Sequence, residues 1–210
     1  MTQKPWLKNY PAHVAWDQKF DAKPLYTLVD DAAAEFGDCV AYDFMGKETT
    51  YNDLLQQVNR MARGLQDIGV GKGVHVGIFM PNCPQFSVAY FGILKAGGTV
   101  VNYSPLYSEQ ELINQVEETD TDIMITLDLA ALYPQMEKVC QKSRLKHLVV
   151  DRFCNALPFP KNLLFRFLKS SMTASVVKDR YYISYEKLMD NEGNVDPVNI
   201  DVMEDVAVIQ

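Results

Sequence analysis

Five residues, Gly69-Val70-Gly71-Lys72-Gly73, have the composition of a loop that could hold a phosphate group. Such a loop follows a strand and opens a helix, so that backbone N–H groups and the helix dipole face the anion. Here the glycines follow an apolar stripe of helical spacing and precede an apolar run that begins at Val74. Because this order is reversed, we predict that Gly69 ends a helix and that the remaining residues form a turn.

The histidines and cysteines have no catalytic or metal-binding spacing. A metal site or a triad built from His13, His75 and His147 would need three distant parts of the sequence, so we interpret each as a surface or core residue. The cysteines show no CxxC pattern and are predicted to be reduced, apolar core residues of a cytosolic protein. They are Cys39, Cys83, Cys140 and Cys154.

Two loops could line a ligand site, because each follows an apolar run. Met80-Pro81-Asn82 ends one run, and α/β proteins bind ligands beyond the carboxyl ends of strands. Tyr103-Ser104-Pro105-Leu106-Tyr107 follows the next run. Structural roles are the alternatives: a Pro-Asn turn that caps the following helix in the first case, and an ordinary exposed loop in the second.

The elements that must position these residues alternate between strand and helix patterns. Strands separated by single helices of this length require right-handed crossovers and a mostly parallel sheet covered on both faces, so we predict an α/β fold with three layers, αβα. Apolar runs predict strands at 39–44, 74–80, 99–102, 123–127, 147–150 and 205–210. Helical spacing predicts helices at 25–36, from a cap at Asn52 or Asp53 to Ile68, and at 85–95, 109–118 and 129–140. The first helix is expected to place Leu28, Val29, Ala32, Ala33 and Phe36 on one face.

The last residues, Asp205-Val206-Ala207-Val208-Ile209-Gln210, predict a buried strand in the interior of the sheet. Active-site loops lie just beyond such strands, so we expect the loop that follows to fall outside residues 1–210. Without it, apolar surface and unpaired backbone groups would be exposed. We therefore expect the chain alone to be marginally stable or to self-associate.

Composition and charge describe a globular protein. With 48% hydrophobic and 22% charged residues, 210 residues can bury a full core. The net charge of −7 argues against nucleic acid as a partner, since a phosphate backbone favours a basic surface. The first ten residues lack the apolar run of a secretory signal, and no stretch of about 20 apolar residues could span a bilayer. We expect a cytoplasmic protein, at most peripheral on the inner face of a membrane.

A long ordered series of motifs runs from Val74 to Leu112. It comprises VHVGIFMPNCPQ at 74–85, AYFGILKAGG at 89–98, VVNYSPLYS at 100–108 and Glu111-Leu112, preceded by Thr50-Tyr51 and Asp53-Leu54. In these motifs the chain resembles the amino-terminal part of a long-chain fatty acyl-CoA synthetase (fatty-acid–CoA ligase) of the adenylate-forming, AMP-binding superfamily. The opening Trp6-Leu7, Tyr10-Pro11 and Val14 resembles the bacterial long-chain branch more than aryl or acetyl ligases.

This resemblance implies part of the large amino-terminal domain of a two-step ligase. A fatty carboxylate would attack the α-phosphate of ATP, with Mg²⁺, and the CoA thiol would then displace AMP. In such enzymes the strand that matches Glu204 to Gln210 leads directly into the loop that cradles the phosphates. The resemblance therefore assigns no catalytic, cofactor-binding or metal-binding residue to this chain. The chain alone is expected to be inactive and to bind no cofactor tightly.

Two other functions remain open from the sequence. The first is a noncatalytic α/β binding or interaction module that retains the sheet but has lost the catalytic activity. The second is a ligase for aryl or short-chain acids, which the insertion after Asp151 disfavours. The expected partners of the long-chain ligase are a fatty acid, ATP and CoA, and a homodimer is a further expectation.

The similarity weakens in a basic segment, residues 151–180. Six basic and two acidic residues give it a net charge of +4, against −11 for the rest of the chain. A short helix from Lys161, after Pro158 and Pro160, has the pattern of an interfacial helix. Weak contact with anionic membranes is predicted through Phe159, Lys161, Leu163, Leu164, Arg166, Phe167, Leu168 and Lys169. The alternative is an ordinary amphipathic helix packed on the domain, or a surface insertion.

These patterns divide the chain into four parts. Residues 1–24 form an amino-terminal arm, and 25–150 form the α/β subdomain. Residues 151–180 form the basic amphipathic insertion, and 181–210 connect it to the final strand.

Overall fold

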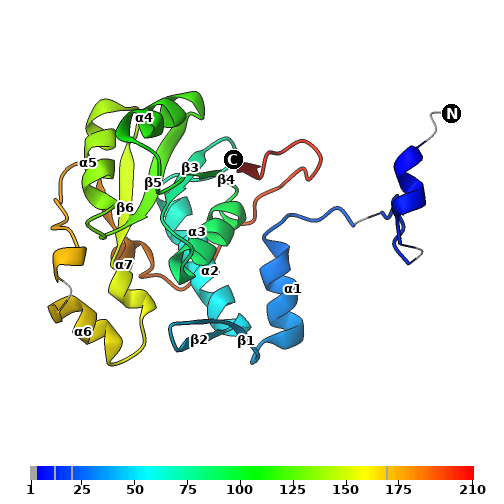
Figure 1. The fold of residues 1–210 in the computed structure, drawn as a ribbon, viewed down its shortest axis with the longest axis horizontal. Helices are drawn as coiled ribbons and strands as arrows, with labels where there is room; N and C mark the ends of the chain where they lie inside the picture. The colour runs from blue at the N-terminus through cyan, green and yellow to red at the C-terminus, as the bar shows by residue number, and fades with distance from the viewer. Residues whose placement is uncertain (1–3, 12, 20, 169) are drawn as a thin grey trace.

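A computed structural model describes the backbone of residues 4–11, 13–19, 21–168 and 170–210, and their side chains except those of 166–168 and 170. Its centre is a six-stranded sheet in which all neighbouring strands are parallel, in the order β7-β6-β5-β3-β4-β8 (Figure 1). The predicted α/β fold is confirmed. The strands are β3 His75–Phe79, β4 Thr99–Asn102, β5 Thr121–Leu127, β6 His147–Asp151, β7 Tyr182–Ser184 and β8 Val208–Ile209.

Helices cover both faces of this sheet. The chain moves from β3 outward to β4 and then back across β3 to β5, so right-handed crossovers place the connecting helices on opposite faces. α2 (Tyr51–Asp67) packs against α3 (Pro84–Lys95) in one layer, and α4 (Glu109–Glu118) against α5 (Tyr133–Lys142) in the other. α1 (Thr27–Phe36) and α7 (Tyr185–Leu188) contact α2. The predicted three-layer αβα architecture is therefore confirmed.

The remaining elements lie outside these layers. The strands β1 (Val40–Phe44) and β2 (Lys47–Thr50) form an antiparallel hairpin of their own. The segment after β6 contains the 3-10 helix η2 (Phe153–Ala156), α6 (Lys161–Leu168) and the 3-10 helix η3 (Ser170–Met172). Near the amino terminus, η1 (Pro5–Asn9) belongs to an arm that extends away from the domain (Figure 1). Among the described residues, every helix is too short or too polar to cross a bilayer.

The ends of α2 show how local sequence sets a helix. The helix is capped by Thr50, and the predicted cap at Asn52 or Asp53 is wrong by two or three residues. Thr50 Oγ1 accepts from the Asp53 N–H at 3.1 Å, while the Asp53 carboxylate accepts from the Thr50 N–H at 3.3 Å, a capping box. At the other end Gly69 has φ +94°, a conformation that glycine adopts without strain. Gly69 thus ends the helix as predicted.

Two expected elements differ from the structure for identifiable reasons. α5 begins at Tyr133 rather than 129, because the backbone of residues 128–130 bonds to residues 172–174 instead: Ala130 N donates to Met172 O, and Ala174 N to Asp128 O. The predicted apolar face of α1 is also only partly buried. Val29 and Ala33 are buried, but Leu28 is 57% and Phe36 46% exposed because α1 packs mainly against α2 and leaves these two side chains uncovered.

The final strand is neither as long nor as buried as predicted. β8 contains only Val208 and Ile209, both half-buried, and Val206 is 59% exposed. It pairs with β4 alone, so within the described residues it is an edge strand of the sheet rather than an interior one. The adjoining residues 201–205 form turns. In them the Asp201 N–H donates to the Asp205 carboxylate, and the Asp205 N–H donates to the Asp201 carbonyl oxygen.

Candidate functional site

A buried carboxylate, Asp151, marks the carboxyl edge of the parallel sheet, where α/β proteins place their ligands. It is the last residue of β6 and only 2% exposed. Burial raises its pKa from 3.8 to about 6, although hydrogen bonds to the carboxylate oppose the shift. One of these comes from Asn155 Nδ2, 2.7 Å from Asp151 Oδ1. Asp151 can therefore exchange a proton near neutral pH.

The neighbours of Asp151 explain why a neutral carboxyl suits the position. Gln85, from the first turn of α3, is 5% exposed, and its Oε1 atom has no hydrogen-bond partner among the described residues. The buried phenol of Tyr185 also lies against the carboxyl group and has a raised pKa because of its burial. A protonated Asp151 can donate its O–H to Gln85 Oε1, whereas the hydrogen bonds that the carboxylate accepts from Asn155 and Gln85 favour the ionised form and are outweighed by burial. Sequence reasoning missed this group, although an aspartate directly after a buried apolar run was visible.

A second carboxylate, Asp128, follows the neighbouring strand β5. It accepts a hydrogen bond from the Phe153 N–H at 2.8 Å, and burial raises its pKa. Asp128 and Asp151 both line a cleft of about 280 Å³, whose other charged residues are Arg152, Lys178 and Glu186. Arg152 and Glu186 approach to 3.6 Å at its mouth. The cleft can accept a small polar molecule and exchange a proton with it.

The two loops singled out from the sequence each begin with a buried residue. Met80 and Cys83 are buried, and Cys83 rather than Asn82 occupies the cap of α3, without a side-chain cap bond. Tyr103 is buried and its hydroxyl bonds to Thr119 and Thr121 at 3.1 and 2.8 Å. Leu106, at the tip of the second loop, is 93% exposed, and Pro81 and Asn82 of the first loop are exposed as well.

The amino termini of α3 and α4 are poorly suited to a nucleotide phosphate. A phosphate site needs free N–H donors at a helix amino terminus. α3 opens with Pro84, which has no N–H, and the first turn of α4 carries Glu109 and Glu111, which repel an anion. Gly71 and Gly73 precede β3 rather than a helix, as predicted. Among these residues no group of three His, Cys, Asp or Glu side chains is placed to hold a metal ion.

The scattered histidines and cysteines occupy separate places. His75 Nδ1 lies 2.5 Å from the Thr119 carbonyl oxygen, His147 Nδ1 is buried without a partner among the described residues, and His13 is exposed. None of the four cysteines forms a disulfide. Cys83 and Cys140 are buried, in agreement with the predicted core role, whereas Cys39 is exposed and Cys154 half-buried.

The residues predicted to contact membranes lie at the periphery on and before α6, the helix expected from Lys161. Phe159 is 78% exposed, and Leu163 and Leu164 are about half exposed, at 46% and 51%. Lys161 is exposed and its Nζ atom donates to the Met45 carbonyl oxygen at 2.7 Å. The side chains of Arg166, Phe167 and Leu168, and all of Lys169, lie outside the described residues.

The chain belongs to the family of AMP-binding enzymes, whose model matches residues 29–210. Within that family it is 36% identical over 186 residues to a long-chain-fatty-acid–CoA ligase of Bacillus subtilis, a match that covers 89% of this chain and 31% of that protein. It is 31% identical over 215 residues to the corresponding ligase of Yersinia pestis, covering 99% and 38%. The resemblance found in the motifs is confirmed. The chain spans about a third of the length of these relatives.

Solved structures share the fold. A coronafacic acid ligase from Pectobacterium brasiliense superposes with a TM-score of 0.71 at 18% identity, covering 89% of this chain and 33% of that one. A long-chain-fatty-acid–CoA ligase from Archaeoglobus fulgidus has a TM-score of 0.68 at 19% identity, covering 91% and 34%. At these identities the likeness shows the fold alone.

Proposed function

We propose that these residues belong to an ATP-dependent long-chain fatty-acid–CoA ligase. The observation that carries the proposal is the 36% identity to such a ligase over 89% of the chain. In the overall reaction, a fatty acid, ATP and CoA give acyl-CoA, AMP and pyrophosphate. A carboxylate oxygen first displaces pyrophosphate from the α-phosphate. The thiolate sulfur of CoA then attacks the acyl carbonyl, and AMP leaves with the bonding electrons. Mg²⁺ would neutralise the phosphates.

The part that this chain plays is that of a scaffold. β8 pairs with β4 in the register Val101–Ile209, so both strands end at the same carboxyl edge. Because the amino termini of α3 and α4 are poorly suited to a phosphate, we infer that the groups that bind ATP lie outside residues 1–210. The 210-residue chain alone should then form no acyl-adenylate. Exchange of labelled pyrophosphate into ATP, at millimolar ATP with oleate, should not exceed a heat-denatured control, and saturable exchange would contradict this inference.

A chimera tests the ligase itself. Residues 25–210 would replace the matching part of the Bacillus subtilis ligase, and formation of oleoyl-CoA would be measured. We expect a folded chimera to form oleoyl-CoA, because the matched segment keeps the sheet that supports the site. A folded chimera inactive toward all fatty acids would contradict the proposal. A second chimera, built in the Yersinia pestis ligase, guards against one unfavourable junction, and circular dichroism establishes folding.

The same assay separates the alternatives. Turnover of benzoate or acetate with none of oleate would favour a ligase for aryl or short-chain acids. A chimera that folds and binds oleate without turnover would favour a noncatalytic module. We place the proposed ligase in the cytoplasm, which the absence of disulfides among its cysteines supports. A homodimer is also proposed, and sedimentation equilibrium would test it.

A further inference from the structure

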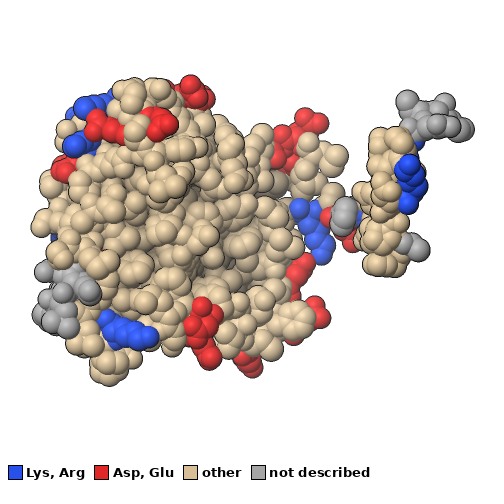
Figure 2. Space-filling model, in the orientation of Figure 1, with Lys and Arg blue, Asp and Glu red and all other residues tan. Residues whose placement is uncertain are grey.

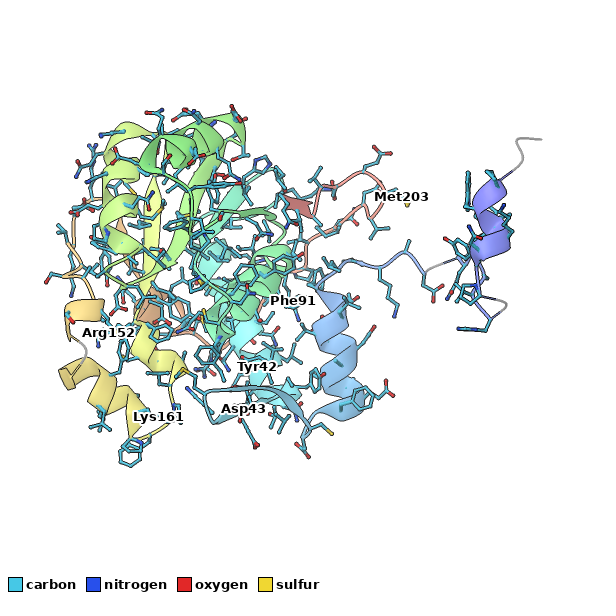
Figure 3. The ribbon with its side chains drawn as sticks, in the orientation of Figure 1. Tyr42, Asp43, Phe91, Arg152, Lys161 and Met203 are labelled. Carbon is cyan, nitrogen blue, oxygen red and sulfur yellow. The ribbon has the colours of Figure 1, made fainter. Side chains whose placement is uncertain are left out.

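The tip of the β1–β2 hairpin and α6 lie side by side, although more than 100 residues separate them in sequence. Lys161 Nζ donates to the Met45 carbonyl oxygen in the hairpin turn at 2.7 Å. Lys47 Nζ donates to the carbonyl oxygen of Asn155, in η2, also at 2.7 Å. Figure 3 shows Lys161 beside the hairpin that carries Asp43. Two ammonium groups therefore join the hairpin to the segment that carries α6.

A row of aromatic rings fixes the rotation of α6 against this hairpin. Phe44 meets Phe153 edge to face with ring centroids 6.3 Å apart, and Phe153 meets Phe165 at 5.2 Å. Since Phe165 points toward η2, the side chains of Leu163 and Leu164 are left facing outward. The predicted apolar face of α6 is thus not buried against the domain at the two positions that the structure describes.

The hairpin turn and the segment that carries α6 together form a projecting surface with exposed apolar side chains. The outer surface of α6 and the hairpin consists of Met45, Phe159, Leu163 and Leu164, which are 55%, 78%, 46% and 51% exposed. The hairpin and α6 lie at the edge of the molecule (Figure 1), and Phe159 lies in the turn just before α6. A projecting, apolar-tipped surface suits a deformable apolar phase better than the rigid groove of a partner protein.

Charge around the outer surface of α6 and the hairpin favours an anionic phase. Lys47 and Lys161 are exposed, and their positive charge attracts anionic headgroups even while both ammonium groups donate to backbone carbonyl oxygens. The segment 151–180 carries +4 in a chain of net −7. Figure 2 shows one basic group at this lower edge, among uncharged atoms, with acidic groups further along the same edge. The hairpin also carries two exposed carboxylates, Asp43 and Glu48, whose charge opposes this attraction.

We propose that α6 and the hairpin tip form one membrane-contact surface, in which Met45, Phe159, Leu163 and Leu164 enter the interface of an anionic bilayer. The contribution of the hairpin to this surface is new, because Met45 lies outside the helical pattern from which membrane contact was predicted. The inference rests on the proposed function, because membrane contact would serve an enzyme whose substrates, long-chain fatty acids, partition into membranes. Vesicle binding is measured without turnover, so either proposal can fail while the other stands.

Co-sedimentation of the 210-residue chain with vesicles tests this surface. We expect binding to vesicles of phosphatidylglycerol and phosphatidylcholine, weaker binding at high salt, and little binding to phosphatidylcholine alone. Met45→Glu and Leu164→Glu should each weaken binding at least about tenfold, by burying a charge in the interface. Leu106→Glu, which adds the same charge at a 93% exposed position in the loop between β4 and α4, is the matched control and should bind as the wild type.

Three outcomes would overturn the proposal. The first is a wild type that ignores anionic vesicles at low salt. The second is a Met45→Glu variant that binds normally while Leu164→Glu does not, which would limit contact to α6. The third is a dimer that Met45→Glu dissociates, because a second copy would then cover the surface. Near-equal melting temperatures of the variants establish that loss of binding is not loss of folding.

Discussion

The helix α4 and the helix α6 have similar lengths and similar apolar periodicity, yet their leucines have different surroundings. Leu112 of α4 is 0% exposed because the sheet lies beneath it and α5 beside it. Leu164 of α6 is 51% exposed because the helix is held at the edge of the molecule through Phe165 and Lys161. The comparison teaches that a periodic pattern identifies an apolar face, while only neighbouring elements decide whether that face is covered.

The largest difference should be seen when both leucines are truncated. Leu112→Ala removes a fully buried side chain and leaves a cavity, so it should lower the free energy of unfolding by about 2–5 kcal/mol. Leu164→Ala should change it by no more than about 0.5 kcal/mol, because the side chain already meets water. Urea unfolding followed by circular dichroism would measure both. Equal losses would show that α6 is packed as tightly as α4.

A smaller effect, with a pH signature, is expected at Asp151. Its pKa of about 6 in the folded state lies above the unfolded value of 3.8, so the folded chain binds more protons between these values. The free energy of unfolding should therefore fall as pH rises from about 4 to about 6, and stay low above. Asp151→Asn should abolish the fall and stabilise the chain at pH 7.5 by about 1–3 kcal/mol.

The control for Asp151 is Asp205, a carboxylate whose pKa is lowered rather than raised in the folded state. Lys72 lowers the pKa of Asp205, so Asp205→Asn should not stabilise the chain at pH 7.5. Melting curves from pH 4 to pH 8 would compare the two variants. Equal destabilisation by Asp151→Asn at every pH would mean that Asp151 is ionised in the folded state throughout.

The smallest effect concerns the cap of α4. Ser108 and Glu111 form a capping box in which the Glu111 carboxylate accepts from the Ser108 N–H at 2.7 Å. Ser108→Ala should lower the free energy of unfolding by about 1 kcal/mol. Ser108→Thr should restore most of this loss, because threonine also caps, as Thr50 does in α2. A loss in Ser108→Thr as large as that in Ser108→Ala would mean that crowding, rather than capping, sets the cost.

Local sequence was enough to predict the bounds of helices and turns wherever residues close in the sequence determine them. The bounds of α4 agree with the prediction residue for residue, because its cap and its apolar stripe lie within one short stretch. The same holds for Gly69, whose conformation the turn itself requires. The start of α5 could not be found in this way, since residues 128–130 are drawn into hydrogen bonds with residues 172–174, some 40 positions away.

For the candidate site, the sequence by itself determined the chemical types: an aspartate after a buried run, a basic segment with apolar spacing, and the motifs of the AMP-binding family. Tertiary structure alone decided what these residues do. Asp151 has a pKa raised to about 6 only because the fold buries it beside residues of α3, η2 and α7. Met45 joins α6 only because a hairpin 116 residues earlier in the sequence folds back beside Lys161. Burial and proximity depend on distant parts of the chain, and no local pattern records them.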